Sequence, residues 1–162
     1  MNLFRRLFAK NDPPPQSGAL SPRDIQMMDR ALELAQRAAE IGEVPVGCVV
    51  YDTNTGEILG EGFNRRETDQ DPIAHAEMIA ITQAAKRIGS WRLNSCTLVV
   101  TLEPCIMCAG ACVNSRVGRV VFGATDPKAG GAHSLYKLLE DPRLNHRAET
   151  HSGLRADSSA KL

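Results

Sequence analysis

The chain has 162 residues, of which 43% are hydrophobic and 23% charged, and this is the size and mix of one globular domain. Nineteen basic residues balance nineteen acidic ones, which excludes a strongly basic nucleic-acid coat and an acidic disordered tail. The apolar runs are far shorter than the roughly 18 residues that a transmembrane helix needs. We therefore expect a soluble protein that meets any polyanion through a local patch.

The cysteines predict reduced thiols and not a disulfide framework. Their number is odd, and the chain carries no convincing secretory signal, so we expect a cytoplasmic protein. Metal binding or core packing must then explain them. The five positions are Cys48, Cys96, Cys105, Cys108 and Cys112.

Residues 1–20 are predicted to be a disordered N-terminal extension, because 11–21 are rich in proline, serine and glycine. The folded domain is expected over 21–162. Ser21 and Pro22 predict the start of a helix that ends at Gly42, with Asp24 adding a favourable charge to the first turn. Its predicted buried face consists of Ile25, Met28, Leu32, Ala35 and Ala39.

Beyond this helix, strands are expected to alternate with helices. A hairpin is predicted from residues 46–51 and 57–63, and a helix from Asp71-Pro72 to Gly89 with Ile73 on its buried face. Further predicted elements are strands at 97–102 and 119–123, a helix at 105–115 and a short helix at 135–140. Strands that alternate with helices indicate a sheet with parallel crossovers.

Four residues carry the candidate chemistry: His75, Glu77, Cys105 and Cys108. Two cysteines spaced Cys-x-x-Cys at a helix start put both sulfurs on one side of the first turn, where the helix dipole favours thiolate. With His75 they make three ligands, which suit a catalytic zinc whose fourth position stays open for water. Glu77 suits the proton shuttle between that water and the substrate, because a coordinated carboxylate would block the open position.

Simpler explanations exist for each motif alone. A Cys-x-x-Cys pair is often half of a structural zinc site or a redox pair, and a buried histidine is often a hydrogen-bonded core residue. A structural site needs a second pair, which the chain lacks at the usual spacing. Cys112 is an alternative fourth ligand, but core packing is the more common role for such a thiol, as for Cys48 and Cys96.

His-x-Glu followed by Pro-Cys-x-x-Cys is an already recognised signature of zinc nucleobase deaminases. From about Pro22 to Leu154 the chain resembles one branch of them, the bacterial tRNA-specific adenosine deaminases of the cytidine/deoxycytidylate deaminase superfamily. The segments that carry the resemblance are Glu43-Val44-Pro45-Val46-Gly47, Glu61-Gly62-Phe63-Asn64-Arg65, His75-Ala76-Glu77, Thr101-Leu102-Glu103-Pro104-Cys105, Met107-Cys108-Ala109-Gly110-Ala111, Val121-Phe122-Gly123-Ala124, Asp126-Pro127-Lys128-Ala129-Gly130 and Asn145-His146-Arg147.

The resemblance implies an α/β fold of three α/β/α layers, cytidine-deaminase-like, with a mixed sheet of about five strands and the hairpin at one edge. It implies hydrolytic deamination of the wobble adenosine of a tRNA anticodon to inosine, in a homodimer with one Zn²⁺ per subunit. His75, Cys105 and Cys108 match the zinc ligands, and Glu77 matches the proton shuttle. Asn64 matches a residue that hydrogen-bonds the target nucleoside. Asp126, Lys128, Ser134 and Asn145 match RNA-contacting loop positions.

Two other functions remain open. A small-molecule deaminase of cytosine, cytidine or guanine shares the zinc constellation and differs mainly in its loops. A non-catalytic RNA-binding zinc module is the alternative from another class, and Glu77 beside an open three-ligand site argues against it. The sequence also departs from the family at its C-terminus, where the usual helix is expected to be shortened.

Overall fold

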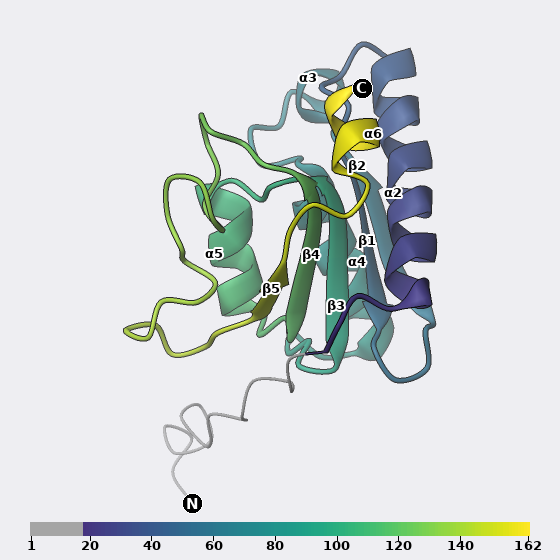
Figure 1. Cartoon of the computed structure of the whole chain (residues 1–162). Helices are drawn as coiled ribbons and strands as arrows, with labels where there is room; N and C mark the ends of the chain where they lie inside the picture. The colour runs from purple at the N-terminus through teal and green to yellow at the C-terminus, as the bar shows by residue number, and fades with distance from the viewer. Residues whose placement is uncertain (1–17) are drawn as a thin grey trace, which may run out of the picture.

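The computed structural model describes residues 18–162 as a five-stranded sheet with helices on both faces (Figure 1). Residues 1–17 of the predicted N-terminal extension lie outside the described residues. The sheet order is β2-β1-β3-β4-β5, in which β1 pairs antiparallel with β2 and β3, while β3, β4 and β5 are parallel. The elements are α2 (Pro22–Glu40), β1 (Gly47–Asp52), β2 (Ile58–Phe63), α3 (Arg66–Asp69), α4 (Ala76–Ile88), β3 (Cys96–Leu102), α5 (Ile106–Asn114), β4 (Arg119–Ala124), β5 (Glu149–His151) and α6 (Ala156–Ala160).

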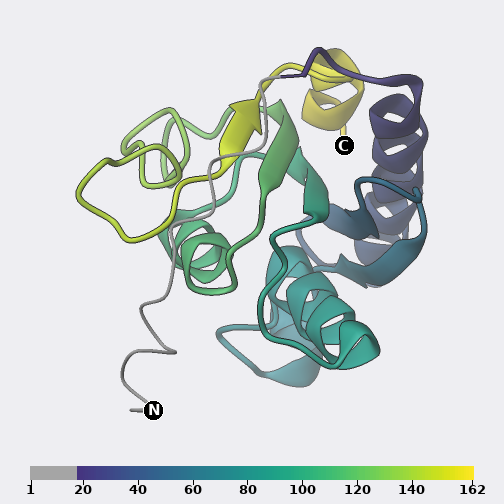
Figure 2. The same ribbon diagram turned by 90° about the horizontal axis from the view of Figure 1, so that it is seen from below.

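The three layers confirm the predicted fold class. Helices α2 and α6 lie on one face of the sheet, while α4 and α5 cover the other, as the view from below shows (Figure 2). Alternate residues of β3 show the division, because Val99 packs with α2 whereas Leu98 and Val100 pack with α4 and α5. The hairpin lies at one edge of the sheet, as predicted. Within residues 18–162 no helix is long and apolar enough to cross a membrane.

Helix α2 begins as predicted, and Met28 and Ala35 are buried as expected, but the buried face is shifted from the predicted one. Ser21 and Asp24 cap each other reciprocally, each side chain accepting a hydrogen bond from the other residue's amide. Ile25 and Ala39, predicted to be buried, are exposed. The reason is that Asp24 itself is buried and belongs to the inward face, so hydrophobicity alone misplaces that face. Its members are Asp24, Met27, Met28, Ala31, Leu34, Ala35 and Ala38.

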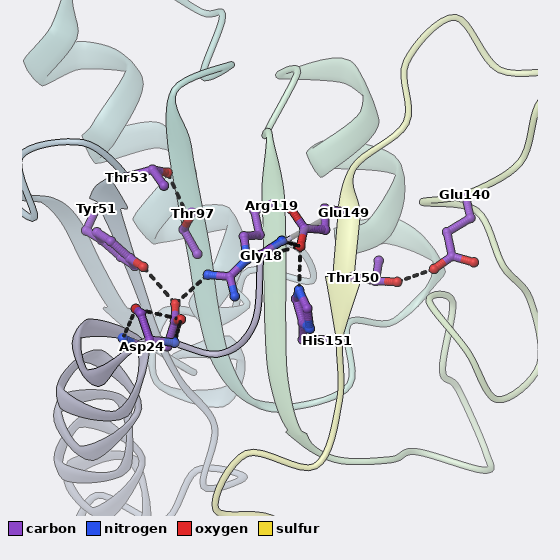
Figure 3. Close-up of polar contacts among 11 residues, drawn as sticks. Gly18, Asp24, Tyr51, Thr53, Thr97, Arg119, Glu140, Glu149, Thr150 and His151 are labelled. Atoms are coloured by element: carbon purple, nitrogen blue, oxygen red, sulfur yellow. Dashed lines mark hydrogen bonds and ion pairs between the residues drawn. The ribbon is translucent and has the colours of Figure 1, made fainter. Parts of the chain in front are cut away.

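A buried polar network joins the start of α2 to the sheet (Figure 3). The Asp24 carboxylate accepts hydrogen bonds from the Tyr51 hydroxyl and the Arg119 guanidinium, both at 2.7 Å. Arg119 also lies 3.8 Å from Glu149, the first residue of β5. Burial alone would raise the pKa of Asp24, but the hydrogen bonds from the backbone, Arg119 and Tyr51 hold that pKa below its ordinary value. The network ties α2 to the beginnings of the parallel strands.

Replacing Asp24 by asparagine should lower the free energy of unfolding at pH 7 by about 3 kcal/mol, because the buried Arg119 then loses its carboxylate partner at 2.7 Å and keeps only Glu149 at 3.8 Å. The folded-state pKa of Asp24 lies below that of the unfolded chain. Its stabilisation is therefore present above the unfolded value of about 3.9 and is lost as the pH falls through the folded value. Denaturant unfolding at pH 7 and pH 3 should show the Asp24→Asn difference shrinking in acid. An equal difference at both pH values would contradict this account.

Helix α4 begins at Ala76 and not at Asp71-Pro72, so the predicted start is wrong. The Asp71 carboxylate accepts a hydrogen bond from the Ile73 amide at 2.9 Å, which closes a tight turn before the helix. His75 has an extended backbone and is the N-cap residue of α4. Ile73 consequently precedes the helix and is 53% exposed instead of buried. Because α4 starts later than predicted, His75 lies at its N-terminal end.

Two glycines of β2 allow α4 to lie directly on the sheet. A Cβ atom at Gly62 would lie 2.3 Å from the Ala76 carbonyl oxygen, and one at Gly60 would lie 2.2 Å from that of Ala80. Such distances leave no room for a side chain. The close approach fixes the first turn of α4 against the end of β2.

The predicted short helix at 135–140 is wrong, since residues 135–137 form no regular structure and 138–140 form a turn. The amides of Leu135 and Tyr136 donate to the Gly130 carbonyl, and that of Leu138 donates to the Gly131 carbonyl. These bonds replace the regular ladder of a helix. The segment then leads into β5, which the sequence did not predict because its three residues are only half-buried.

Candidate active site

The candidate site lies where the parallel strands end and two helices begin. Strand β3 leads into Glu103 and Cys105, β4 leads into Asp126, and the first turns of α4 and α5 face the same edge of the sheet. The ends of α2 and β2 add Val44 and Asn64 from the antiparallel side. Ligands in open α/β sheets bind at this edge of the strands.

His75, Cys105 and Cys108 form a group whose ligand atoms lie within 4.8 Å of one another. His75 Nδ1 lies 3.7 Å from Cys105 Sγ and 3.6 Å from Cys108 Sγ. Tetrahedral zinc with bonds of about 2.3 Å to sulfur and about 2.0–2.1 Å to nitrogen separates the two atom types by about 3.5 Å. The donor set and its spacing therefore fit zinc. Cys112, the alternative ligand, is buried in the core and is not part of this group among residues 18–162.

The Cys105 thiol is poised to lose a proton. The hydrogen bond from Cys108 lowers the pKa of Cys105 to about 4, against the opposing effect of burial. The same bond and burial raise the pKa of Cys108, and the hydrogen bond to Cys105 raises the pKa of His75. The environment of Cys105, the N-cap residue of α5, thus favours its thiolate form.

Glu77 lies in the first turn of α4, two residues from His75, and is 3% exposed. Burial raises the pKa of its carboxyl group to about 7. A carboxyl group with a pKa near neutrality can both take up and release a proton at physiological pH. Its position and environment fit the proton shuttle that the sequence predicted.

A cavity of about 180 Å³ opens beside these residues. Of the five residues predicted to contact substrate, Asn64 and Asp126 line it, whereas Lys128, Ser134 and Asn145 are exposed outside its lining. The complete lining is Val44, Val46, Asn64, Arg66, His75, Ala76, Glu77, Leu102, Glu103, Cys105, Asp126 and Ala129. The walls combine apolar side chains with a few polar groups, as small-molecule sites do.

Glu103 is a residue of this site that the sequence did not single out. It is 2% exposed, and its carboxylate accepts hydrogen bonds from the amides of Asp126 at 2.9 Å, His133 at 2.7 Å and Ser134 at 2.8 Å. The Ser134 hydroxyl also donates to it, so this predicted RNA contact is engaged inside the chain. The sequence feature that could have identified Glu103 is its position directly after a strand predicted to be buried. Glu103 anchors the 126–134 segment to the end of β3.

We expect Glu103→Gln to destabilise the fold by about 1–3 kcal/mol, because an amide nitrogen then faces buried donors. The effect should concentrate on the 126–134 segment, with faster hydrogen exchange at the His133 and Ser134 amides than in wild type. Glu140→Gln is the matched control at an exposed glutamate of the following segment. Unchanged exchange at His133 and Ser134 would show that Glu103 does not anchor the segment.

Comparison with known proteins matches residues 21–124 to the cytidine and deoxycytidylate deaminase zinc-binding region. The tRNA-specific adenosine deaminase of Bacillus subtilis (strain 168) is 52% identical over 132 residues, covering 82% of this chain and 81% of that protein. A solved structure from work on A-to-I editing by tRNA:A34 deaminases at the wobble position is 38% identical, with a TM-score of 0.79. The match covers 84% of this chain and 97% of that chain. The structure of a guanine deaminase from Bacillus subtilis is 36% identical, with a TM-score of 0.60. That match covers 67% of this chain and 69% of the other. The matched family region contains His75, Glu77, Cys105 and Cys108.

Proposed function

Because this chain belongs to the cytidine and deoxycytidylate deaminase family, we propose that it converts the wobble adenosine of a tRNA anticodon to inosine. The reaction is a hydrolysis, in which one water is consumed and ammonia leaves as oxygen replaces the amino group of the purine. The observation that carries the proposal is the meeting of Glu77 with the His75–Cys105–Cys108 group at one cavity. Relatives named for this activity support the choice of substrate.

His75 Nδ1 and the sulfurs of Cys105 and Cys108 would hold one zinc ion per subunit, because their chemistry and spacing fit it. When bound, zinc supplies a Lewis acid that makes water a nucleophile at neutral pH. The two thiolates also balance the charge of a divalent cation.

Glu77 moves the protons of the reaction. Its carboxylate takes one proton from the attacking water and delivers it to a ring nitrogen of the base. It then takes the second proton from the hydroxyl group added to the base and delivers that proton to the amino group, which leaves as ammonia. Burial suits this role, because the pKa of about 7 lets the carboxyl group accept and return a proton in one turnover. Asn64, which also lines the cavity, holds the nucleoside by hydrogen bonds.

The cavity favours an unpaired base over one in a duplex. Glu77 is 3% exposed, so a base must leave its stack to reach it. An anticodon loop presents such bases at a modest unstacking cost. Arg66 is the one basic side chain in the lining besides His75, and its guanidinium suits a neighbouring phosphate.

The proposal extends to a homodimer in the cytoplasm. Val44, Ile73 and Ile106 are large apolar side chains, each at least 49% exposed, and they flank the cavity or its metal-binding residues. A second subunit would cover such side chains. The reduced cysteines that the zinc group requires suit a reducing compartment.

Guanine deamination is the second candidate, favoured by the 36% identity to a guanine deaminase structure. A substrate profile separates the two functions. The zinc-loaded chain should deaminate a synthetic anticodon stem-loop with adenosine at the wobble position and leave guanine, cytosine and cytidine unchanged. The same adenosine within a perfect duplex is the control and should not react. Conversion of a free base or nucleoside with an unchanged stem-loop would overturn the proposal.

A further inference from the structure

We propose that Glu43 is a positioning residue that fixes the orientation of the Asn64 amide in the cavity, and with it the hydrogen-bonding pattern that the nucleoside meets. The inference deepens the proposed function and rests on it, because it takes Asn64 as a contact of the substrate. Asn64 belongs to the predicted site, whereas Glu43 has no role in it.

Glu43 reaches the site from the end of α2. Gly42 adopts a left-handed conformation with φ of 82°, and the Glu43 amide donates back to the Ala38 carbonyl at 2.9 Å. This helix ending turns the Glu43 side chain inward, where the residue is 5% exposed. The neighbouring Asn64 is held by its own backbone, whose amide donates to the Val46 carbonyl at 3.0 Å.

The Glu43 carboxylate is surrounded by donors. It accepts hydrogen bonds from Asn64 Nδ2 at 3.1 Å, from the Thr68 amide at 2.6 Å and from the Glu67 amide at 3.3 Å. An ionised carboxylate only accepts, so the part of the Asn64 side chain that faces it must be the NH₂ group. The partner therefore dictates the amide orientation, which the shape of asparagine alone leaves open.

The consequence for the cavity follows from the geometry of an amide. With Nδ2 bound to Glu43, Oδ1 points away from the carboxylate and is free to accept a hydrogen bond from a ligand. Asn64 is 7% exposed and lines the cavity together with Glu77 and Asp126. A glutamine at position 43 could face either end of the amide, because its own side chain both donates and accepts. The orientation would then be unspecified.

A double-mutant cycle tests whether Glu43 acts through Asn64. We expect Glu43→Gln to lower kcat/KM for the adenosine stem-loop about tenfold, the loss expected for one oriented hydrogen bond. In an Asn64→Ala background the same substitution should change kcat/KM less than about twofold, since its target is gone. Glu40→Gln, at the exposed end of α2, is the matched control and should behave as wild type. Losses that simply add in the double variant would overturn the proposal.

Exchanging the donor and acceptor between positions 43 and 64 gives a second test. Asn64→Asp alone places two carboxylates face to face and should lose activity, whereas Glu43→Gln combined with Asn64→Asp restores one donor and one acceptor. The double variant should recover activity relative to Asn64→Asp, and failure to recover would count against the pairing.

A spectroscopic readout separates this proposal from the function on which it rests. In ¹H–¹⁵N spectra of the zinc-loaded wild type, the Asn64 side-chain amide protons should exchange slowly with solvent, and Glu43→Gln should accelerate that exchange. If wild type leaves the stem-loop unchanged, the proposed function fails. This measurement still decides whether Glu43 holds the Asn64 side chain. Equal exchange in both proteins would refute the pairing whatever the substrate.

Discussion

Glu77→Gln should abolish turnover, with a loss of about 10²- to 10⁴-fold in kcat, while zinc content stays at the wild-type level. The amide has the shape of the carboxylate but cannot carry a proton between water and base. Zinc should remain because Glu77 is not part of the group that gathers at His75. The fold should remain as well, since a neutral side chain at this buried position relieves the desolvation that raises the pKa of Glu77.

The measurement is single-turnover deamination of the stem-loop, with zinc determined by elemental analysis on the same sample. Glu40→Gln is the control, because this exposed glutamate at the end of α2 lies outside the cavity lining. Retained turnover in Glu77→Gln would remove the proposed shuttle.

Cys108→Ala should lose zinc and, with it, all measurable activity. A tetrahedral site with two remaining protein ligands, His75 and Cys105, falls below the three that catalytic zinc sites normally have. Cys112→Ala is the informative control, because Cys112 lies one turn further along α5. Among residues 18–162, Cys112 packs in the hydrophobic core and is not part of the group that His75, Cys105 and Cys108 form.

Elemental analysis should therefore give about one zinc per chain in Cys112→Ala and close to none in Cys108→Ala. Cys112→Ala should retain activity and lose only the stability of a small core substitution. The reverse pattern, full zinc in Cys108→Ala and none in Cys112→Ala, would make Cys112 the ligand.

The metal group was predictable because its signals are local. Cys105 and Cys108 share one helical turn, and His75 precedes another helix, so short spacings already bring the side chains to helix ends. The alternation of strands and helices likewise predicted the parallel crossovers, whereas the mixed sheet with the hairpin at its edge was implied by the family resemblance.

The errors arose where specific hydrogen-bond partners override the hydrophobic pattern. Asp24 is buried because Arg119, 95 residues away, neutralises it, and this rotates the inward face of α2 away from Ile25. Residues 135–140 form no helix because amides of this segment donate to Gly130 and Gly131. Neither partner can be identified from hydrophobic periodicity.

The two glutamates beside the cavity were missed for the same reason. Glu43 and Glu103 resemble surface residues in the sequence, yet each is nearly buried and accepts backbone amides from a segment that follows much later in the chain. They hold opposite walls, Glu43 on the Asn64 side and Glu103 on the Asp126 side. The cavity is thus shaped by two carboxylates that accept hydrogen bonds from backbone amides.

The most direct test of the central claim is deamination of tRNA itself. Zinc-loaded protein is incubated with total tRNA, and inosine is located by nucleoside mass spectrometry and by sequencing of the anticodon loop. Inosine should appear at the wobble position, ammonia should be released in equal amount, and neither product should form with Glu77→Gln. Unchanged tRNA, under conditions in which the same protein sample deaminates guanine or cytidine, would contradict the account.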